Sequence, residues 1–202
     1  LVPVRVGRMI ASPYGFLRGS ATVMAEDVAT LPSTGITPVI CGDAHIGNFG
    51  LYASPERELV LDLNDFDEAH PGAWEWDLRR LVASAWVLGR QNGASADDCE
   101  EAVTACVASY RDQIRELYDL PLFERSFLRL DMEQLTDTAS EKSLRKQIKR
   151  SVKKAYGRTS DRALPRFTEE TRRGRRIVEE PPLITRVSSG EEDLLAAALD
   201  GY

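Results

Sequence analysis

The feature that most constrains the fold is a pair of long amphipathic segments that follow one another along the chain. Apolar residues recur every three or four positions over 74–91 and again over 95–118, which predicts two helices. Ser95, followed by two aspartates, is typical of a helix N-terminus, and Pro121 is expected to end the second helix. We therefore expect an α+β, mainly helical fold with both helices in its core.

A β-hairpin is predicted just before these helices. Residues 48–52 and 58–63 have strand-like patterns, and turn-forming residues occupy 54–57 between them. A turn at this position pairs residues whose numbers sum to about 111, which places Asn48 close to Asp62.

The other segments have weaker patterns. Helices are expected over 16–30, 122–135, 140–156 and 191–199, and a short strand over 37–41. Residues 1–15 and 157–190 are rich in Pro and Gly, or in Arg pairs without periodicity, and are predicted to be irregular.

Charge is divided unevenly along the 202 residues. The formal net charge is −6, yet residues 142–176 hold 14 of the 26 Lys and Arg residues and only three acidic ones. We expect two regions, 1–135 with the helical core and site, and 136–202 with a basic helix, a linker and a short helix. A solvated basic face is favoured over nucleic-acid binding, because few aromatic residues are present to stack bases. Docking of the basic helix on the acidic remainder of the chain is the third interpretation.

Composition also indicates where in the cell the protein is expected to be located. No window approaches the roughly 18 consecutive apolar residues of a membrane span, and the first twenty residues lack a signal-peptide pattern. The three cysteines contain no CxxC pair, so neither a disulfide framework nor a zinc knuckle is favoured. A cytoplasmic protein without membrane association is expected.

Acidic, amide and imidazole side chains are concentrated between Cys41 and Asp77. Asp43 follows the first strand, Asn48 begins the hairpin, and Asp62 lies near the hairpin's end. Amide and carboxylate oxygens suit Mg²⁺, which completes its octahedron with water and phosphate oxygens. A second carboxylate can orient or deprotonate an attacking hydroxyl. The pattern favours phosphoryl-transfer chemistry, although Asp and Asn are also common in solvated turns.

Two motifs within this region carry a resemblance. Residues 41–50 resemble the G-D-x-H-x-x-N catalytic loop of aminoglycoside phosphotransferases and choline kinases, a relative of the protein-kinase catalytic loop. Residues 59–65 are similar to their metal-binding segment, and residues 76–78 to a later motif whose Asp supports the catalytic loop. Over roughly residues 5–95 the chain more closely resembles a bacterial family, domain of unknown function 2252.

The resemblance implies a Mg²⁺- and ATP-dependent phosphotransferase that acts on a hydroxyl of a small molecule or protein. A metal-dependent phosphohydrolase and a noncatalytic nucleic-acid or partner-binding module are the alternatives. The implied catalytic residues are Asp43, which orients or deprotonates the hydroxyl, and His45, which holds the loop. The implied metal ligands are Asn48, Asp62 and Asp65, and Arg18 is a candidate contact to the cofactor's phosphates. Asp77 is expected to be a helix N-cap.

The implied fold is the C-terminal lobe of a protein-kinase-like domain, with the site on a small hairpin and no equivalent of the N-terminal lobe. Only 42 residues precede Asp43, and they contain neither a glycine-rich phosphate loop nor a strand lysine. Members of the resembled family continue into a glycine-rich segment and a lysine-bearing strand. We therefore expect this chain to be the N-terminal part of a longer protein that supplies the missing lobe, and to be weak or inactive alone.

Overall fold

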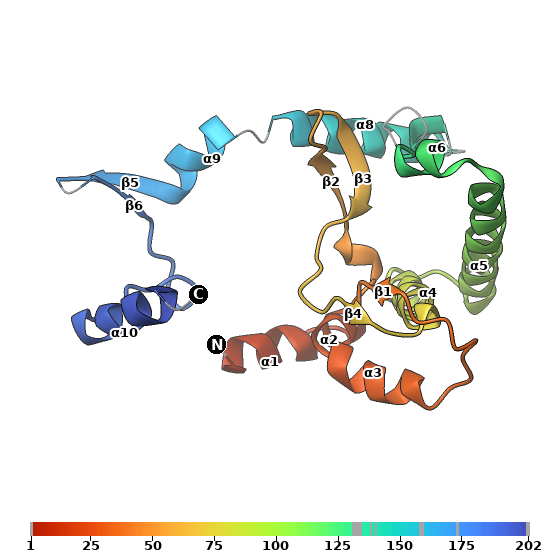
Figure 1. Cartoon of the computed structure of the whole chain (residues 1–202), viewed down its shortest axis with the longest axis horizontal. Coiled ribbons are helices and arrows are strands. Elements are labelled where there is room, and N and C mark those ends of the chain that lie inside the picture. The colour runs from red at the N-terminus through yellow and green to blue at the C-terminus, as the bar shows by residue number, and fades with distance from the viewer. Residues whose placement is uncertain are drawn as a thin grey trace. The chain divides into compact units, whose positions relative to one another are not determined.

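The computed structural model describes residues 2–130, 135–137, 139, 141–157, 160–172 and 174–200, without the side chains of 160–163, 189 and 200. These residues form an α+β structure that is mainly helical, as predicted (Figure 1). They fall into two compact units, Val2–Tyr156 and Gly157–Tyr202, which are described separately.

Three short helices open the first unit: α1 (Val2–Ile10), α2 (Pro13–Gly19) and α3 (Ala21–Ala29). The prediction that residues 1–15 are irregular is therefore wrong. Pro13 occupies the first turn of α2, where its missing N–H is tolerated, and the Ser12 hydroxyl accepts from the Gly15 N–H at 3.0 Å. The single helix predicted over 16–30 is interrupted at Ser20.

Two small antiparallel sheets follow. β2 (Phe49–Ala53) and β3 (Leu59–Leu63) form the predicted hairpin, in a register that pairs Gly50 with Asp62. Paired residue numbers sum to 112, one more than the value expected from the turn. β1 (Val39–Ile40) confirms the upstream strand and pairs with β4 (His70–Pro71).

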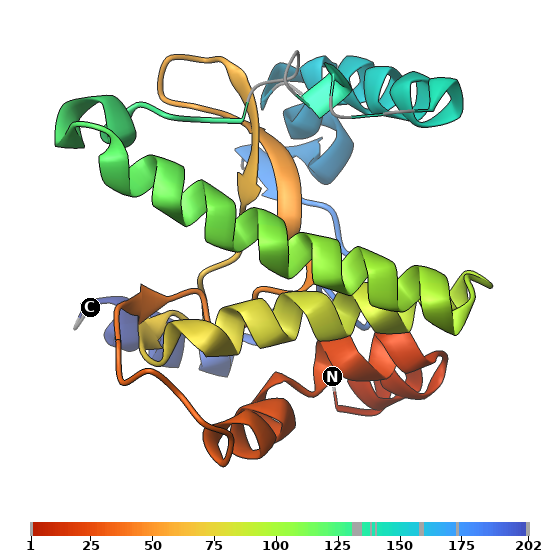
Figure 2. The same cartoon turned by 90° about the vertical axis from the view of Figure 1, so that its right-hand side faces the viewer.

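The two long helices are confirmed as α4 (Trp74–Gln91) and α5 (Ala96–Asp119). A capping box begins α5, because the Ser95 hydroxyl accepts from the Asp98 N–H and the Asp98 carboxylate accepts from the Ser95 N–H. The helices pack along one another (Figure 2), and α4 also contacts α2, α3 and β1. None of the helices described has the length and apolar character needed to cross a membrane.

The helix predicted over 122–135 is shorter than expected. It is α6 (Leu122–Ser126). Beyond this helix, the Leu130 carbonyl accepts a hydrogen bond from the Leu61 N–H of β3 at 3.1 Å. The rest of that prediction falls partly on residues 131–134, which lie outside the described residues.

The basic helix is confirmed as α8 (Lys142–Tyr156), and it contacts both β2 and β3. Because of these contacts, the boundary between the compact units falls after Tyr156 rather than at the 135/136 boundary expected from the sequence.

The second unit contains α9 (Ser160–Phe167), β5 (Thr168–Thr171), β6 (Gly174–Ile177) and α10 (Ser189–Asp200). The helix predicted over 191–199 is confirmed. The irregular structure predicted over 157–190 is wrong for 160–171 and 174–177, which form α9, β5 and β6, and is confirmed for 178–188. Opposite charges face each other across the β5–β6 hairpin, where Arg175 Nη2 lies 2.7 Å from Glu170 Oε1. The strands therefore lack the apolar alternation by which they could be recognised.

Candidate active site

The loop between β1 and β2 closes tightly around buried side chains. Gly42 has a φ of +83°, and a Cβ atom there would lie 2.2 Å from the Glu68 carbonyl oxygen, so the turn requires glycine. Asn48 Nδ2 donates to the Asp43 carbonyl at 2.8 Å, and the His45 N–H donates to the same oxygen at 2.8 Å. These bonds fix Asp43 and Asn48, both buried, at the two ends of one turn.

Helix α4 holds this loop at both ends. The Asp77 carboxylate accepts from the Cys41 N–H at 2.7 Å and from the Gly42 N–H at 2.9 Å. The Ser84 hydroxyl, which is fully buried, accepts from the Ile46 N–H at 2.8 Å. The predicted N-cap role of Asp77 is wrong, because α4 begins three residues earlier and the Asp77 carboxylate binds the loop backbone instead.

Arg80, also on α4, is a site residue that the sequence analysis missed. Its side chain is buried, and Nε donates to Asp43 Oδ1 at 2.7 Å. Nη2 donates to the Leu17 carbonyl of α2 at 2.6 Å. The available signal is spacing, since Asp77, Arg80 and Ser84 lie three and four residues apart and share one helical face.

His45 is 2% exposed and holds the loop from inside. Its Nδ1 accepts from the Gly47 N–H at 3.0 Å, so the neutral ring carries its proton on Nε2, 3.8 Å from Asp43 Oδ2. Burial lowers the pKa of His45 below 6.5; Asp43 opposes this shift, whereas the charges of Arg18 and Arg80 add to it. His45 is thus neutral at pH 7 with both nitrogens directed at protein groups, which suits positioning better than proton abstraction.

Two of the predicted metal ligands, Asn48 and Asp62, lie near the end of the hairpin that joins the loop between β1 and β2. Asp62 is exposed on β3 opposite Gly50, and its Oδ1 accepts from the Leu63 N–H at 2.8 Å. The Asn64 N–H donates to the Asn48 carbonyl at 3.0 Å, which continues the pairing beyond the strands. Asn48 therefore lies two residues from the partner of Asp62 rather than directly opposite it.

The other two predicted site residues lie around this loop. Asp65 is exposed after β3, and its carbonyl accepts from the Cys41 thiol at 3.2 Å. Arg18 is exposed on α2, where its charge acts on His45. Within the described parts of the chain, no three His, Cys, Asp or Glu residues are grouped as a metal site.

The donor chemistry nevertheless fits Mg²⁺ accompanied by phosphate. Asn48 uses Nδ2 to close the turn, so its amide oxygen is the atom that would coordinate a metal, and Asp62 and Asp65 present exposed carboxylates. Mg²⁺ commonly takes only one or two protein carboxylates and completes its shell with water and substrate phosphates. These residues do not form a preassembled protein cage.

A family model described as an uncharacterized protein conserved in bacteria (DUF2252) matches residues 1–202. The chain belongs to this family. The family model covers the whole chain, whereas the resemblance noted from the sequence covers roughly residues 5–95. No curated protein and no solved structure matches the chain.

Proposed function

We propose that this member of DUF2252 carries part of the active site of a Mg²⁺- and ATP-dependent phosphotransferase that acts on a hydroxyl group. The observation that carries the proposal is the buried Asp43 carboxylate, fixed by Arg80 at 2.7 Å within a turn that Asn48 closes. Phosphoryl transfer depends mainly on positioning and electrostatic stabilisation, and a carboxylate held in this way can orient an attacking hydroxyl.

In the proposed reaction the acceptor hydroxyl donates a hydrogen bond to Asp43 Oδ2, the oxygen that Arg80 does not hold. The hydroxyl oxygen bonds to the γ-phosphorus, the bond from phosphorus to the bridging oxygen breaks, and ADP leaves. The hydroxyl proton passes to Asp43 and then to solvent. Asn48, Asp62 and Asp65 would hold Mg²⁺, which neutralises charge on the phosphate oxygens when bound.

The same proposal treats the first unit as the counterpart of a kinase C-terminal lobe, supported by the motifs at 41–50 and 59–65. A glycine-rich loop and a lysine normally cover the phosphates in such enzymes. We place these parts in another segment of the gene product, with exposed Arg18 as a candidate phosphate contact.

Two variants of the gene product that contains this chain separate the proposed roles. Asp62→Ala should lose Mg²⁺–ATP binding, measured by titration calorimetry. Asp43→Ala should keep that binding and lose about 10²- to 10⁴-fold in transfer, measured as ADP formation with a panel of hydroxyl acceptors. Asp27→Ala removes an exposed carboxylate from α3 and is the matched control, expected to match the wild type in both assays.

Transfer that persists in both variants would refute the proposal. Phosphate release that requires no acceptor, lost with the same substitutions, would refute the transferase and support a metal-dependent phosphohydrolase.

A further inference from the structure

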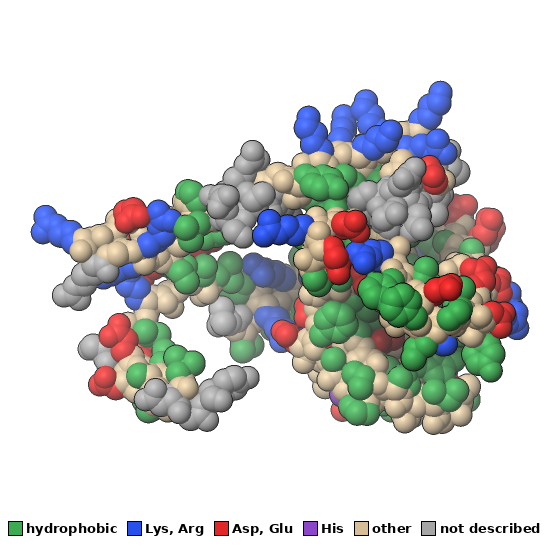
Figure 3. Space-filling view, turned by 45° about the horizontal axis from the view of Figure 1, so that its top comes forward, with side chains coloured by type: hydrophobic (Ala, Val, Ile, Leu, Met, Phe, Trp, Pro, Cys, Tyr) green, Lys and Arg blue, Asp and Glu red, His purple; other side chains and the backbone are tan. Residues whose placement is uncertain are grey.

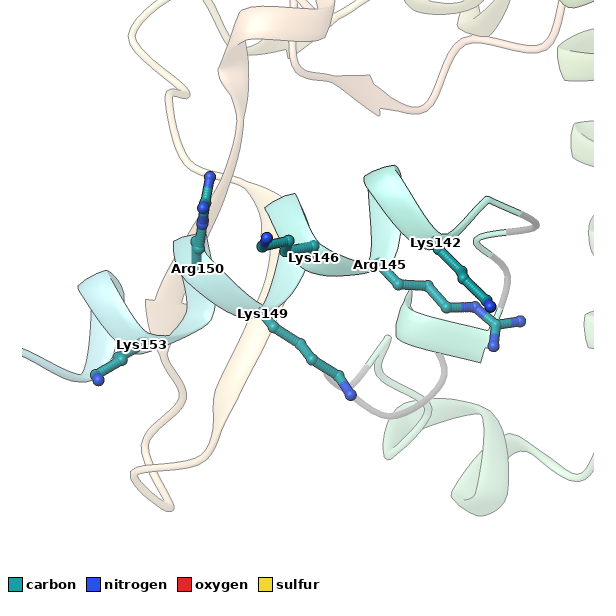
Figure 4. Close-up of a pocket in the computed structure, with 6 residues that line it drawn as sticks. All are labelled: Lys142, Arg145, Lys146, Lys149, Arg150 and Lys153. Atoms are coloured by element: carbon teal, nitrogen blue, oxygen red, sulfur yellow. The ribbon is translucent and has the colours of Figure 1, made fainter.

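The cationic face of α8 is a second surface that the proposed reaction does not use. α8 contains seven Lys and Arg residues and no acidic residue. Six of them recur at helical spacing and line a shallow hollow of about 430 Å³ (Figure 4): Lys142, Arg145, Lys146, Lys149, Arg150 and Lys153. At about 100° per residue, the four lysines fall within an arc of about 60°, and the two arginines flank it, about 140° apart.

The charges on this face lack compensation from the residues that the structure describes. Among the residues that the structure describes, none of the six forms an ion pair, and only Arg145 has a side-chain hydrogen bond, from Nε to the Ala139 carbonyl at 2.7 Å. Like charges three or four residues apart repel by about 0.2 to 0.5 kcal/mol per pair. A bound polyanion would remove this repulsion.

The opposite face of α8 already has a partner. Ile148, Val152 and Ala155 are half-buried, and the helix contacts the β2–β3 hairpin. Helices that bind membrane surfaces insert their apolar face at the acyl boundary, which is not open to this one. The cationic face instead lies outward, as a row of Lys and Arg along one edge in Figure 3. This arrangement favours a ligand that is bound through charge alone.

We propose that the cationic face of α8 binds the phosphate backbone of duplex DNA, with the helix lying along the major groove. The face spans about 16 Å from Lys142 to Lys153, a length over which a duplex presents about ten phosphates. A helix fits the groove, which is about 12 Å wide, so Arg145 and Arg150 on opposite flanks can reach phosphates of both strands. A flat anionic surface would engage only the central lysines.

Little on this face can read bases. The residues that line the hollow are all Lys and Arg, and Tyr156 is the one aromatic residue of α8. Phosphate contacts position a protein without specifying sequence. Binding should therefore be independent of sequence and strongly dependent on salt.

Fluorescence anisotropy with a labelled 20-bp duplex tests this inference. Six phosphate contacts predict a slope of about −5 for log K against log salt concentration, or a loss of about 10³-fold between 50 and 200 mM salt. Lys146→Gln/Lys149→Gln should reduce the slope by about 2 and weaken binding about 50-fold at 100 mM salt. Circular dichroism verifies that the variants remain folded.

The matched control is Arg111→Gln/Arg115→Gln, which removes the same charge from exposed positions on α5 and should leave the slope unchanged. No binding at 50 mM salt, or equal effects of the two double variants, would overturn the inference. Binding to vesicles of anionic phospholipid but not to duplex would overturn it as well. Asp43→Ala should bind duplex like the wild type, so this result does not depend on the proposed phosphotransferase.

Discussion

Arg80→Met is expected to destabilise the first unit by about 3 to 5 kcal/mol, because it leaves the Asp43 carboxylate buried without its cation. The two side chains are 5% and 11% exposed and meet at 2.7 Å, so water has little access to replace the guanidinium. The Leu17 carbonyl loses a donor at the same time. This substitution tests whether the ion pair, rather than hydrophobic packing, fixes the loop.

Thermal unfolding followed by circular dichroism measures the effect. For a unit of this size, each kcal/mol lowers the melting temperature by about 2 to 4 °C, which predicts a decrease of about 6 to 20 °C. The double variant Arg80→Met/Asp43→Asn removes both charges, so its loss should fall at least about 2 kcal/mol short of the sum of the two single losses. Arg90→Met, at an exposed position of the same helix, is the control and should change stability by less than about 1 kcal/mol.

A loss below about 1 kcal/mol for Arg80→Met would refute the reasoning. Additivity of the two single substitutions would refute it too, because an ion pair that fixes the loop must couple them.

Two further substitutions examine the loop. Because the pKa of His45 is lowered on folding, the stability contributed by neutral His45 is present above about pH 6.5 and is lost as the pH falls through that value toward the folded-state pKa. Between pH 7 and 5, the free energy of unfolding measured in urea should fall with the pH in the wild type and in the His70→Gln control, but not in His45→Gln. Equal pH dependence in all three proteins would contradict this prediction. Asp77→Ala removes the acceptor of two loop N–H groups and should cost about 2 to 4 kcal/mol in urea unfolding, whereas Asp77→Asn, which keeps one carbonyl oxygen, should lose about half as much. Equal losses would contradict this prediction, because they would show that the bond kept by asparagine contributes nothing.

Local patterns accounted for much of the fold. The hairpin register followed within one residue from the turn at 54–57, and α4 and α5 followed from their apolar spacing and the Ser95 cap. The errors lay where single residues mislead. Pro13 indicated an irregular segment but occupies a first helical turn, and the β5–β6 hairpin pairs charges where apolar alternation was expected.

The site could be predicted only where it is local in sequence. Asp43 and Asn48 belong to one turn, so their spacing was sufficient to bring them together. Arg80 and Ser84 contact loop residues that lie 37 and 38 positions earlier in the chain, and the sequence alone does not distinguish a buried arginine from a solvated one. Their contacts depend on how α4 packs.

The missed arginine and the mispredicted N-terminal segment are connected by one contact. Arg80 binds Asp43 through Nε and the Leu17 carbonyl through Nη2, so the same guanidinium joins the loop to α2. That carbonyl lies in the last turn of α2, where it also accepts from the N–H and the hydroxyl of Ser20, each at 3.2 Å. A segment interpreted as irregular offers no fixed acceptor, and an arginine without an acceptor would be placed in solvent. The geometry of Asp43 therefore depends on the N-terminal helices as well as on its own loop, and substitutions that unfold α2 should disturb the site without touching it.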